Sequence, residues 1–130
     1  DIITALKQLY PDVQDIEWSQ KGVYYVADCW VNGSELDVWF DANANWIMTE
    51  MEIFREQLPA AVNTAYEESG YGDWVIDNLT KLTFPHKSEE FVFEVQRGAQ
   101  ERALYYSAYG GLLLEKDITD ADDTHWPDVE

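Results

Sequence analysis

The dipeptide Asn32-Gly33 constrains the fold more than any other feature of the sequence. Both residue types tolerate the positive φ angles of a type I′ turn, so the pair predicts a two-residue β-hairpin. The residues that follow support this prediction, because positions 34–41 alternate strictly between the two faces of a strand. One face carries Leu36, Val38 and Phe40, and the other carries Glu35, Asp37, Trp39 and Asp41. We therefore expect an antiparallel sheet in the first half of the chain.

The remaining elements divide the chain into two similar halves. In the first half, apolar residues at helical spacing precede Pro11, and strands are expected at 15–19, 23–31, 34–41 and 46–54. In the second half a helix opens near Pro59, and strands are expected within 74–84 and at 90–96, 101–107 and 112–118. An aromatic strand end, a small-residue turn and an apolar strand recur at 40–48 and 106–114, which indicates an internal repeat.

These patterns predict an α+β chain of two tandem repeats, each a helix plus a four-stranded antiparallel meander. The repeats are expected at 1–55 and 56–118, and the 130 residues fit one compact domain in total. The acidic stretch 119–130 lacks periodicity and is expected to be a loosely held tail. His86 and His125 are both expected at the surface.

A strong excess of acidic residues limits the classes of partner. The chain has 8 Lys and Arg against 26 Asp and Glu, which gives a formal net charge of −18 at pH 7. Because such a field repels phosphate backbones and anionic lipid surfaces, we expect neither nucleic acid nor a membrane surface as partner. Cationic proteins, cationic peptides and divalent metal ions remain electrostatically plausible.

Cys29 is the only cysteine, so neither an internal disulfide nor a cysteine-based zinc site is expected. It lies in an apolar strand-like run, for which a buried structural thiol is the expected role. No apolar run is long enough to span a bilayer, and we therefore expect a soluble chain without membrane insertion.

Several segments resemble the PepSY-like proteins of Bacteroides-type bacteria. They are Tyr10-Pro11, Ile16-Glu17-Trp18, the segments 22–26 and 36–46, and Leu58-Pro59-Ala60-Ala61-Val62. The resemblance implies an exported protein, periplasmic, surface-bound or secreted, with the fold of the beta-lactamase inhibitor protein. In that fold two helix-and-sheet repeats join into one curved sheet with the helices on one face, and the other face is available to partners. The family has no settled activity, and inhibition of beta-lactamases is not implied.

Aromatic residues on a polar strand face are the strongest functional signal. Because Trp39 lies opposite the apolar face of its strand, it is expected to point away from the core, between two aspartates. Aromatic anchors with a polar rim are typical of protein interfaces. The predicted anchors are Tyr24, Trp30, Trp39 and Trp46, and the predicted carboxylate rim is Glu35, Asp37 and Asp41. The alternative is that the sheet buries these aromatic side chains against loops or the other repeat.

Metal and catalytic sites are weakly supported. The segment 41–45 has oxygen-bearing side chains at alternate positions, as a calcium loop has, but Trp46 stands where such a loop needs glycine. Asp and Asn also serve ordinary hairpin turns, which is the preferred interpretation here. The sequence contains no phosphate loop, nucleophile elbow or Cys-His arrangement, so we expect no enzyme and no cofactor.

The leading hypothesis is therefore a non-catalytic exported module that binds a protein or peptide through an aromatic exposed sheet face, with inhibition of the partner as one role open to it. A cationic partner suits the carboxylate rim. A calcium-responsive or purely structural envelope domain is the alternative.

Overall fold

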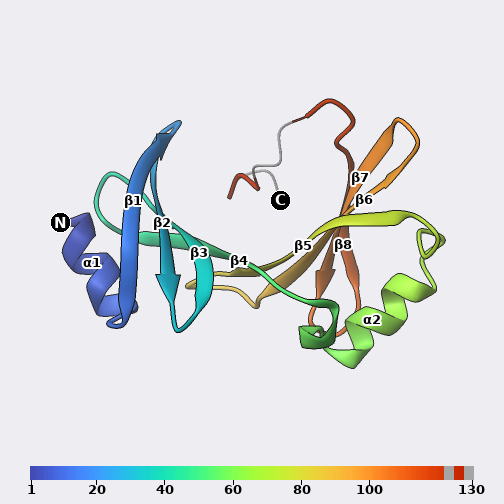
Figure 1. Ribbon diagram of the computed structural model, residues 1–130, viewed down its shortest axis with the longest axis horizontal. Helices are drawn as coiled ribbons and strands as arrows, with labels where there is room; N and C mark the ends of the chain where they lie inside the picture. The colour runs from blue at the N-terminus through green and yellow to red at the C-terminus, as the bar shows by residue number, and fades with distance from the viewer. Residues whose placement is uncertain (122–124, 128–130) are drawn as a thin grey trace. The chain divides into compact units, whose positions relative to one another are not determined.

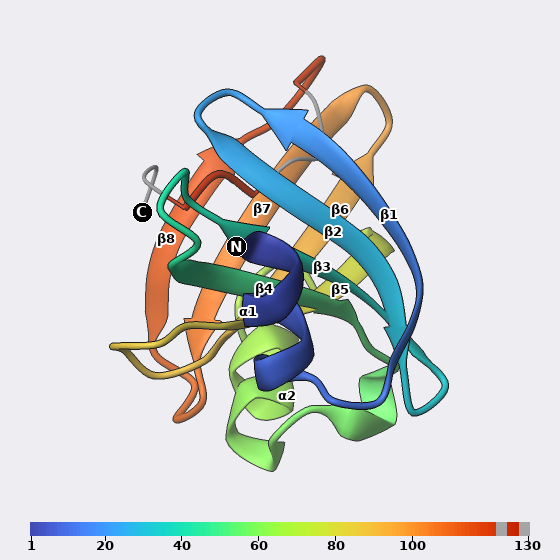
Figure 2. The same ribbon diagram turned by 90° about the vertical axis from the view of Figure 1, so that its left-hand side faces the viewer.

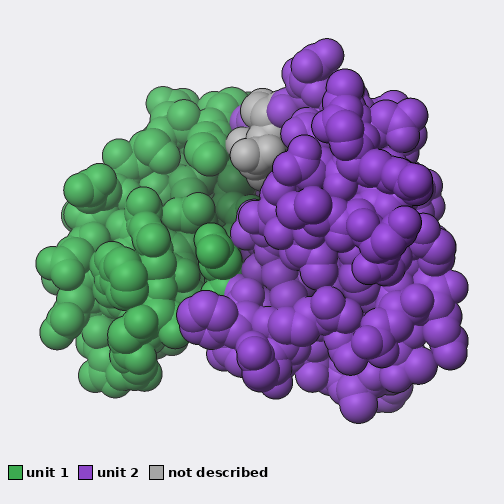
Figure 3. Space-filling model, turned by 45° about the vertical axis from the view of Figure 1, so that its right-hand side comes forward, with its two compact units in different colours: residues 1–52, 83–87 green, residues 53–82, 88–130 purple. Residues whose placement is uncertain are grey.

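A computed structural model describes residues 1–121 and 125–127 of the chain. Within those residues it has two α-helices and one eight-stranded antiparallel sheet, in which the strands follow the order of the sequence (Figure 1). The α+β class predicted from the sequence is therefore confirmed. Internal contacts divide the chain into two compact units (Figure 3). Unit 1 comprises residues 1–52 and 83–87, and unit 2 comprises residues 53–82 and 88–130.

Unit 1 begins with a helix that is followed by four strands. Their bounds are α1, Ile2–Leu9; β1, Val13–Lys21; β2, Tyr24–Val31; β3, Ser34–Phe40; and β4, Trp46–Glu52. Oδ1 of Asp1 accepts a hydrogen bond from the backbone N–H of Thr4 at 2.9 Å, which caps the start of α1. The helix ends before Tyr10, whose φ of −129° and ψ of 84° are not helical, because a residue that precedes proline avoids the helical region.

The predicted hairpin forms at Asn32 and Gly33. Their φ angles are 52° and 83°, and Val31 pairs with Ser34 across the turn. This two-residue loop fixes the register of β2 against β3, since both strands run outward from it.

Helix α1 lies across one face of the strands of unit 1 (Figure 2). Leu6 of α1 is completely buried in a cluster with side chains from β2 and β3: Ala27, Cys29, Leu36, Val38 and Phe40. A bulge in β1 between Gln14 and Glu17 lets Val13 and Ile16 both pack on this side, although they are three residues apart. The Cys29 thiol is free and buried, as predicted.

Unit 2 contains the second helix and most of the remaining sheet. Its elements are a 3₁₀ turn η1, Arg55–Gln57; α2, Ala60–Glu67; β5, Val75–Thr83; β6, Glu90–Arg97; β7, Gln100–Ser107; and β8, Leu112–Asp117. Tyr66 of α2 stacks on Phe93 of β6, with ring centroids 4.2 Å apart and planes 3° from parallel. The turn before β8 approaches α2 so closely that a Cβ on Gly110 would stand 2.6 Å from the carbonyl oxygen of Ala61.

Candidate partner-binding face

Four acidic residues, one from each strand, form a row across the face of unit 1 that points away from α1. Glu17 pairs with Asp28, Asp28 with Asp37, and Asp37 with Glu50. Directly opposed residues of antiparallel strands point to the same face, so the four carboxylates are neighbours. We call these four residues the acidic row. The acidic face consists of this row together with Lys21, Tyr24, Trp30, Glu35 and Trp39. Like charges placed opposite one another destabilise a sheet, so the row costs unit 1 stability.

The acidic row perturbs the carboxyl groups around it. Partial burial raises the pKa of Asp37, the charge of Asp28 raises it further, and Lys21 opposes the shift. The pKa of Glu35 is also raised, first by a side-chain hydrogen bond with Asp28 and then by the negative charge of that residue. Burial is thus the main cause at Asp37 and the hydrogen bond with Asp28 the main cause at Glu35, and the negative charge of Asp28 adds to both shifts.

Trp39 lies on the predicted face but is completely buried, with 0% of its side chain exposed. Its indole Nε1 donates a hydrogen bond of 2.7 Å to Oε1 of Glu50. The ring of Tyr24 meets it edge-on at 5.6 Å, and the Lys21 ammonium lies 5.6 Å from its centroid. The strand pattern thus gave the correct face, but the expectation of an exposed anchor is wrong, because the ring is completely buried and contacts side chains of β1, β2 and β4.

The remaining predicted anchors differ in exposure and in position. Trp30 is 43% exposed and pairs with Glu35 across β2 and β3. Tyr24 is half-buried beside Trp39. Trp46 packs instead against the core cluster on the α1 side, and its Nε1 donates to Oγ1 of Thr49 at 3.0 Å. A register shift between Trp39 and Phe40 causes this, since Phe40 pairs with Trp46 and Trp39 with Met48.

Asp41 closes the turn between β3 and β4. Its Oδ1 accepts hydrogen bonds of 2.9 Å from the backbone N–H groups of Asn43 and Asn45, and its Oδ2 accepts one of 3.1 Å from the Asn45 side chain. These bonds, chiefly those from Asn45, lower the pKa of Asp41. The segment 41–45 thus forms a turn that the Asp41 side chain holds, and Asp41 is separate from the acidic row.

Sequence reasoning missed Lys21, Glu17, Asp28 and Glu50 as members of this face. The position of Asp28 could have been predicted from the sequence. Asp28 lies as far before the Asn32-Gly33 turn as Asp37 lies after it, and a two-residue hairpin places such residues opposite each other. The positions of Glu17 and Glu50 depend on the bulge in β1 and the register shift of β4, which no local pattern marks.

A second group of polar side chains lies buried on unit 2. His125 is only 5% exposed, so the expectation that it lies at the surface is wrong. Its Nδ1 lies 2.9 Å from the hydroxyl of Tyr105, and its Nε2 lies 3.4 Å from Oε2 of Glu94. The Lys116 ammonium donates to the same hydroxyl at 3.2 Å, and desolvation lowers the pKa of this lysine.

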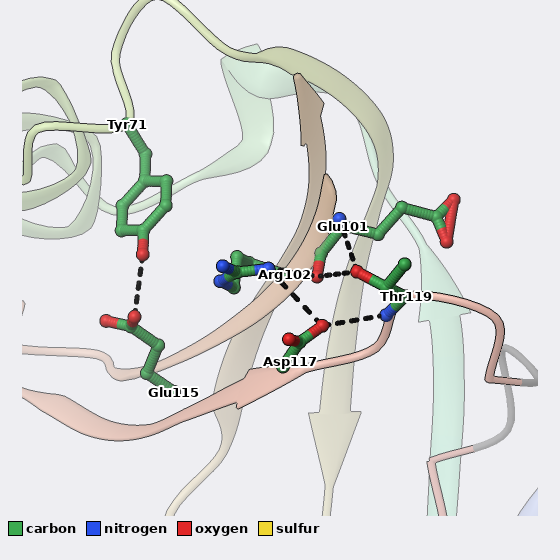
Figure 4. A network of polar contacts seen from close by, with 6 residues as sticks. All are labelled: Tyr71, Glu101, Arg102, Glu115, Asp117 and Thr119. Carbon is green, nitrogen blue, oxygen red and sulfur yellow. Dashed lines mark hydrogen bonds and ion pairs between the residues drawn. The ribbon is translucent and has the colours of Figure 1, made fainter. Parts of the chain in front are cut away.

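Polar contacts also hold the chain that leaves β8 (Figure 4). Oγ1 of Thr119 accepts a hydrogen bond of 3.0 Å from the backbone N–H of Glu101 on β7. Oδ1 of Asp117 accepts from the backbone N–H of Thr119 at 3.0 Å and pairs with Nη1 of Arg102 at 3.3 Å. These bonds fasten the beginning of the C-terminal segment to β7.

Within residues 1–121 and 125–127, no three His, Cys, Asp or Glu side chains are grouped so that they could hold a metal ion. In the same part of the chain, no helix is both long enough and apolar enough to cross a membrane.

Comparison with known proteins identifies the family of this chain. The family described as "Putative beta-lactamase-inhibitor-like, PepSY-like" matches residues 23–114. The chain belongs to the PepSY-like family. The resemblance inferred from its strand and turn segments is thereby confirmed. None of the curated proteins compared matches the chain.

Solved structures of similar sequence have the same fold. A BLIP-like protein from Bacteroides fragilis is 55% identical, with a TM-score of 0.92 over 98% of this chain and 92% of its own. A structure from Bacteroides eggerthii, described as "putative periplasmic proteins", is 32% identical, with a TM-score of 0.89 over 94% and 90% of the two chains. A DUF2874 family protein from Bacteroides ovatus is 30% identical, with a TM-score of 0.89 over 94% and 89%.

Proposed function

We propose that this PepSY-like protein is a non-catalytic module that binds a cationic protein or peptide through the acidic face of unit 1. The acidic row carries the proposal. Its four carboxylates stand opposite one another at a cost in stability, and a cationic partner would relieve their mutual repulsion. The net charge of −18 favours the same class of partner, since it attracts cations over a distance.

The predicted site residues take different roles in this proposal. Trp30 is the exposed aromatic anchor, and Glu35 and Asp37 supply carboxylates beside it. Trp39 positions other residues of the acidic face and does not contact the partner itself. Its indole donates a hydrogen bond to Glu50, and its ring packs against Tyr24. Asp41 and Trp46 support the β3–β4 connection and the core, respectively, and do not contact the partner.

We further infer that the protein works outside the cytoplasm and that its two helix-and-strand halves are a tandem repeat. A relative described as a periplasmic protein supports the first inference. The element order supports the second, because a helix and four strands, α1 and β1–β4, are followed by α2 and β5–β8. Fractionation of cells that produce the native gene product would test the location.

A peptide-display selection tests the binding function. We expect the wild-type protein to enrich peptides that are rich in Lys and Arg and that contact the exposed Trp30. We also expect binding to weaken as the salt concentration rises. The double variant Asp28→Asn/Asp37→Asn should lose at least tenfold in affinity for the selected peptides. The matched control is Glu67→Gln/Glu68→Gln, which removes the same charge from exposed positions at the end of α2.

Two outcomes would reject this function. Equal loss of affinity in the control pair would show that only net charge matters, and selection of neutral peptides that both variants bind equally would remove the acidic face from the site.

A further inference from the structure

The C-terminal segment, which follows β8 from Thr119, inserts the side chain of His125 into the face of unit 2 that lies opposite α2. Glu94, Ala103, Tyr105 and Lys116 share this face, as their cross-strand pairing shows. His125 lies against it, edge-on to the ring of Tyr105 with centroids 5.7 Å apart. Its two ring nitrogens face the Tyr105 hydroxyl and the Glu94 carboxylate.

The groups around His125 are polar rather than apolar. Glu94 is 5% exposed, and a buried carboxylate has a large desolvation cost unless polar partners surround it. Asn78 of β5 donates to Oε2 of Glu94 at 2.9 Å, and Lys116 of β8 donates to Tyr105. Glu90 of β6 is the other buried carboxylate of this strand. Groups from four strands are thus arranged to meet an imidazole.

The attachment of this segment explains why it occupies the site. Thr119 is hydrogen-bonded to the backbone of Glu101 on β7 (Figure 4). The segment therefore starts beside the same sheet, a few residues before His125. A tether of that length gives the segment a high effective concentration at the site without requiring strong contacts. Residue 125 is consequently positioned to compete with any separate molecule.

We propose that this face of unit 2 is a peptide-binding site whose built-in ligand is the C-terminal segment, and that a partner segment displaces it by presenting an imidazole to Glu94 and Tyr105. The proposal rests on the proposed function only in that the partner is a protein or peptide, because the site lies on unit 2 and the acidic row on unit 1. The C-terminal segment then acts as an intramolecular competitor that raises the partner affinity needed for binding.

The direct test supplies the segment in trans. A chain that ends at Ala121 is titrated with a synthetic peptide of residues 119–130, and binding is measured by calorimetry. We expect the shortened chain to bind the peptide at least tenfold more tightly than the intact chain does. A peptide with His125→Ala should bind the shortened chain at least tenfold more weakly, as should wild-type peptide with a Glu94→Gln chain.

A second variant distinguishes loss of binding from loss of the fold. The full-length His125→Ala chain retains its backbone but lacks the imidazole, so it should stay folded by circular dichroism and accept the wild-type peptide. A folded shortened chain that does not bind the peptide would overturn the proposal. Unfolding of both variants would also overturn it, since His125 would then belong to the core of unit 2.

Failure of this proposal can be told apart from failure of the proposed function. Asp28→Asn/Asp37→Asn alters the acidic row alone and should leave peptide binding at unit 2 unchanged. If that variant weakened binding of the 119–130 peptide as much as Glu94→Gln does, the separate site on unit 2 would be rejected.

Discussion

The indole Nε1 of Trp39 donates a 2.7 Å hydrogen bond to Oε1 of Glu50, its neighbour on β4. This bond joins a completely buried aromatic ring to a member of the acidic row. Hydrogen bonds to an ionised carboxylate are stronger than neutral ones, so the ring fixes where one charge of the row stands. Trp39 therefore supports the acidic row from within the protein, whereas Trp30 is the aromatic residue of this face that is exposed.

Replacement of Trp39 should destabilise the protein. Trp39→Ala removes a ring with no exposed surface, and such changes cost about 3–5 kcal/mol. Trp39→Phe should cost less, because it keeps an aromatic ring and removes chiefly the indole donor. Urea unfolding followed by circular dichroism measures both losses. Trp30→Ala is the control, since its side chain is 43% exposed and should lose less than Trp39→Ala. An unchanged unfolding midpoint for Trp39→Ala would contradict the buried position.

Asp37→Asn should raise the stability of the protein at pH 7. Because the pKa of Asp37 in the folded state lies above its ordinary value of 3.8, the folded protein holds this proton more tightly than the unfolded chain does. Well below pH 3.8 both states are protonated and no penalty exists. As pH rises through the raised pKa, ionisation of this partly buried carboxyl beside Asp28 makes folding less favourable.

Urea midpoints of wild type and Asp37→Asn, taken from acid to neutral pH, test this sign. We expect the two midpoints to converge in acid and the variant to be the more stable at neutral pH. Glu67→Gln is a control with the same change of charge at an exposed position of α2. A variant that is less stable than wild type at pH 7 would show that Asp37 makes a favourable ionic contact.

Gly110→Ala should destabilise the protein more than Gly98→Ala. Both glycines have positive φ angles, 85° and 61°, which cost an L-residue about 1–2 kcal/mol. Only at Gly110 would the new Cβ also meet backbone, at 2.6 Å from the oxygen of Ala61, whereas nothing lies within 4 Å at Gly98. Thermal unfolding of the two variants separates the steric effect from the shared conformational effect, and equal losses would argue against close contact of the β7–β8 turn with α2.

Asp41→Ala should lower the stability, and calcium should change the melting temperature of neither wild type nor variant. The reason is that the Asp41 oxygens already accept hydrogen bonds from Asn43 and Asn45 in the turn. Differential scanning fluorimetry with and without millimolar calcium measures both effects. A rise in the wild-type melting temperature that Asp41→Ala abolishes would instead favour a calcium-responsive domain.

Cys29 should resist alkylation while the protein is folded. Burial, followed by the charges of Asp28 and Asp37, raises its pKa to about 11. At pH 8 only about one thiol in a thousand is then ionised, and the thiolate is the reactive form. Iodoacetamide labelling followed by mass spectrometry should be slow in buffer and fast in urea. Rapid labelling of the folded protein would mean that β2 opens locally.

Local signals were sufficient for much of the fold. Asn32-Gly33 specified a hairpin because its conformational preference resides in two adjacent residues, and the alternation after it assigned the faces of β3. The family resemblance came from similar short segments and was confirmed. The buried thiol of Cys29 followed from the apolar strand around it.

The candidate site depended on contacts that no local pattern contains. Alternation placed Trp39 on the correct face, but it could not show that the ring is buried and contacts Tyr24, Lys21 and Glu50, which lie on three other strands. The side taken by Trp46 depends on a register shift between β3 and β4.

His125 shows most clearly the difference between what local sequence signals determine and what tertiary contacts determine. The sequence by itself determined the strands, the hairpin and the net charge, since each depends on neighbouring residues or on composition. Only the tertiary structure decided that His125 is buried, because its partners Tyr105 and Glu94 are distant in sequence. A side chain without periodic neighbours carries no local sign of its burial, and its position is set by the surface that the rest of the chain folds to provide.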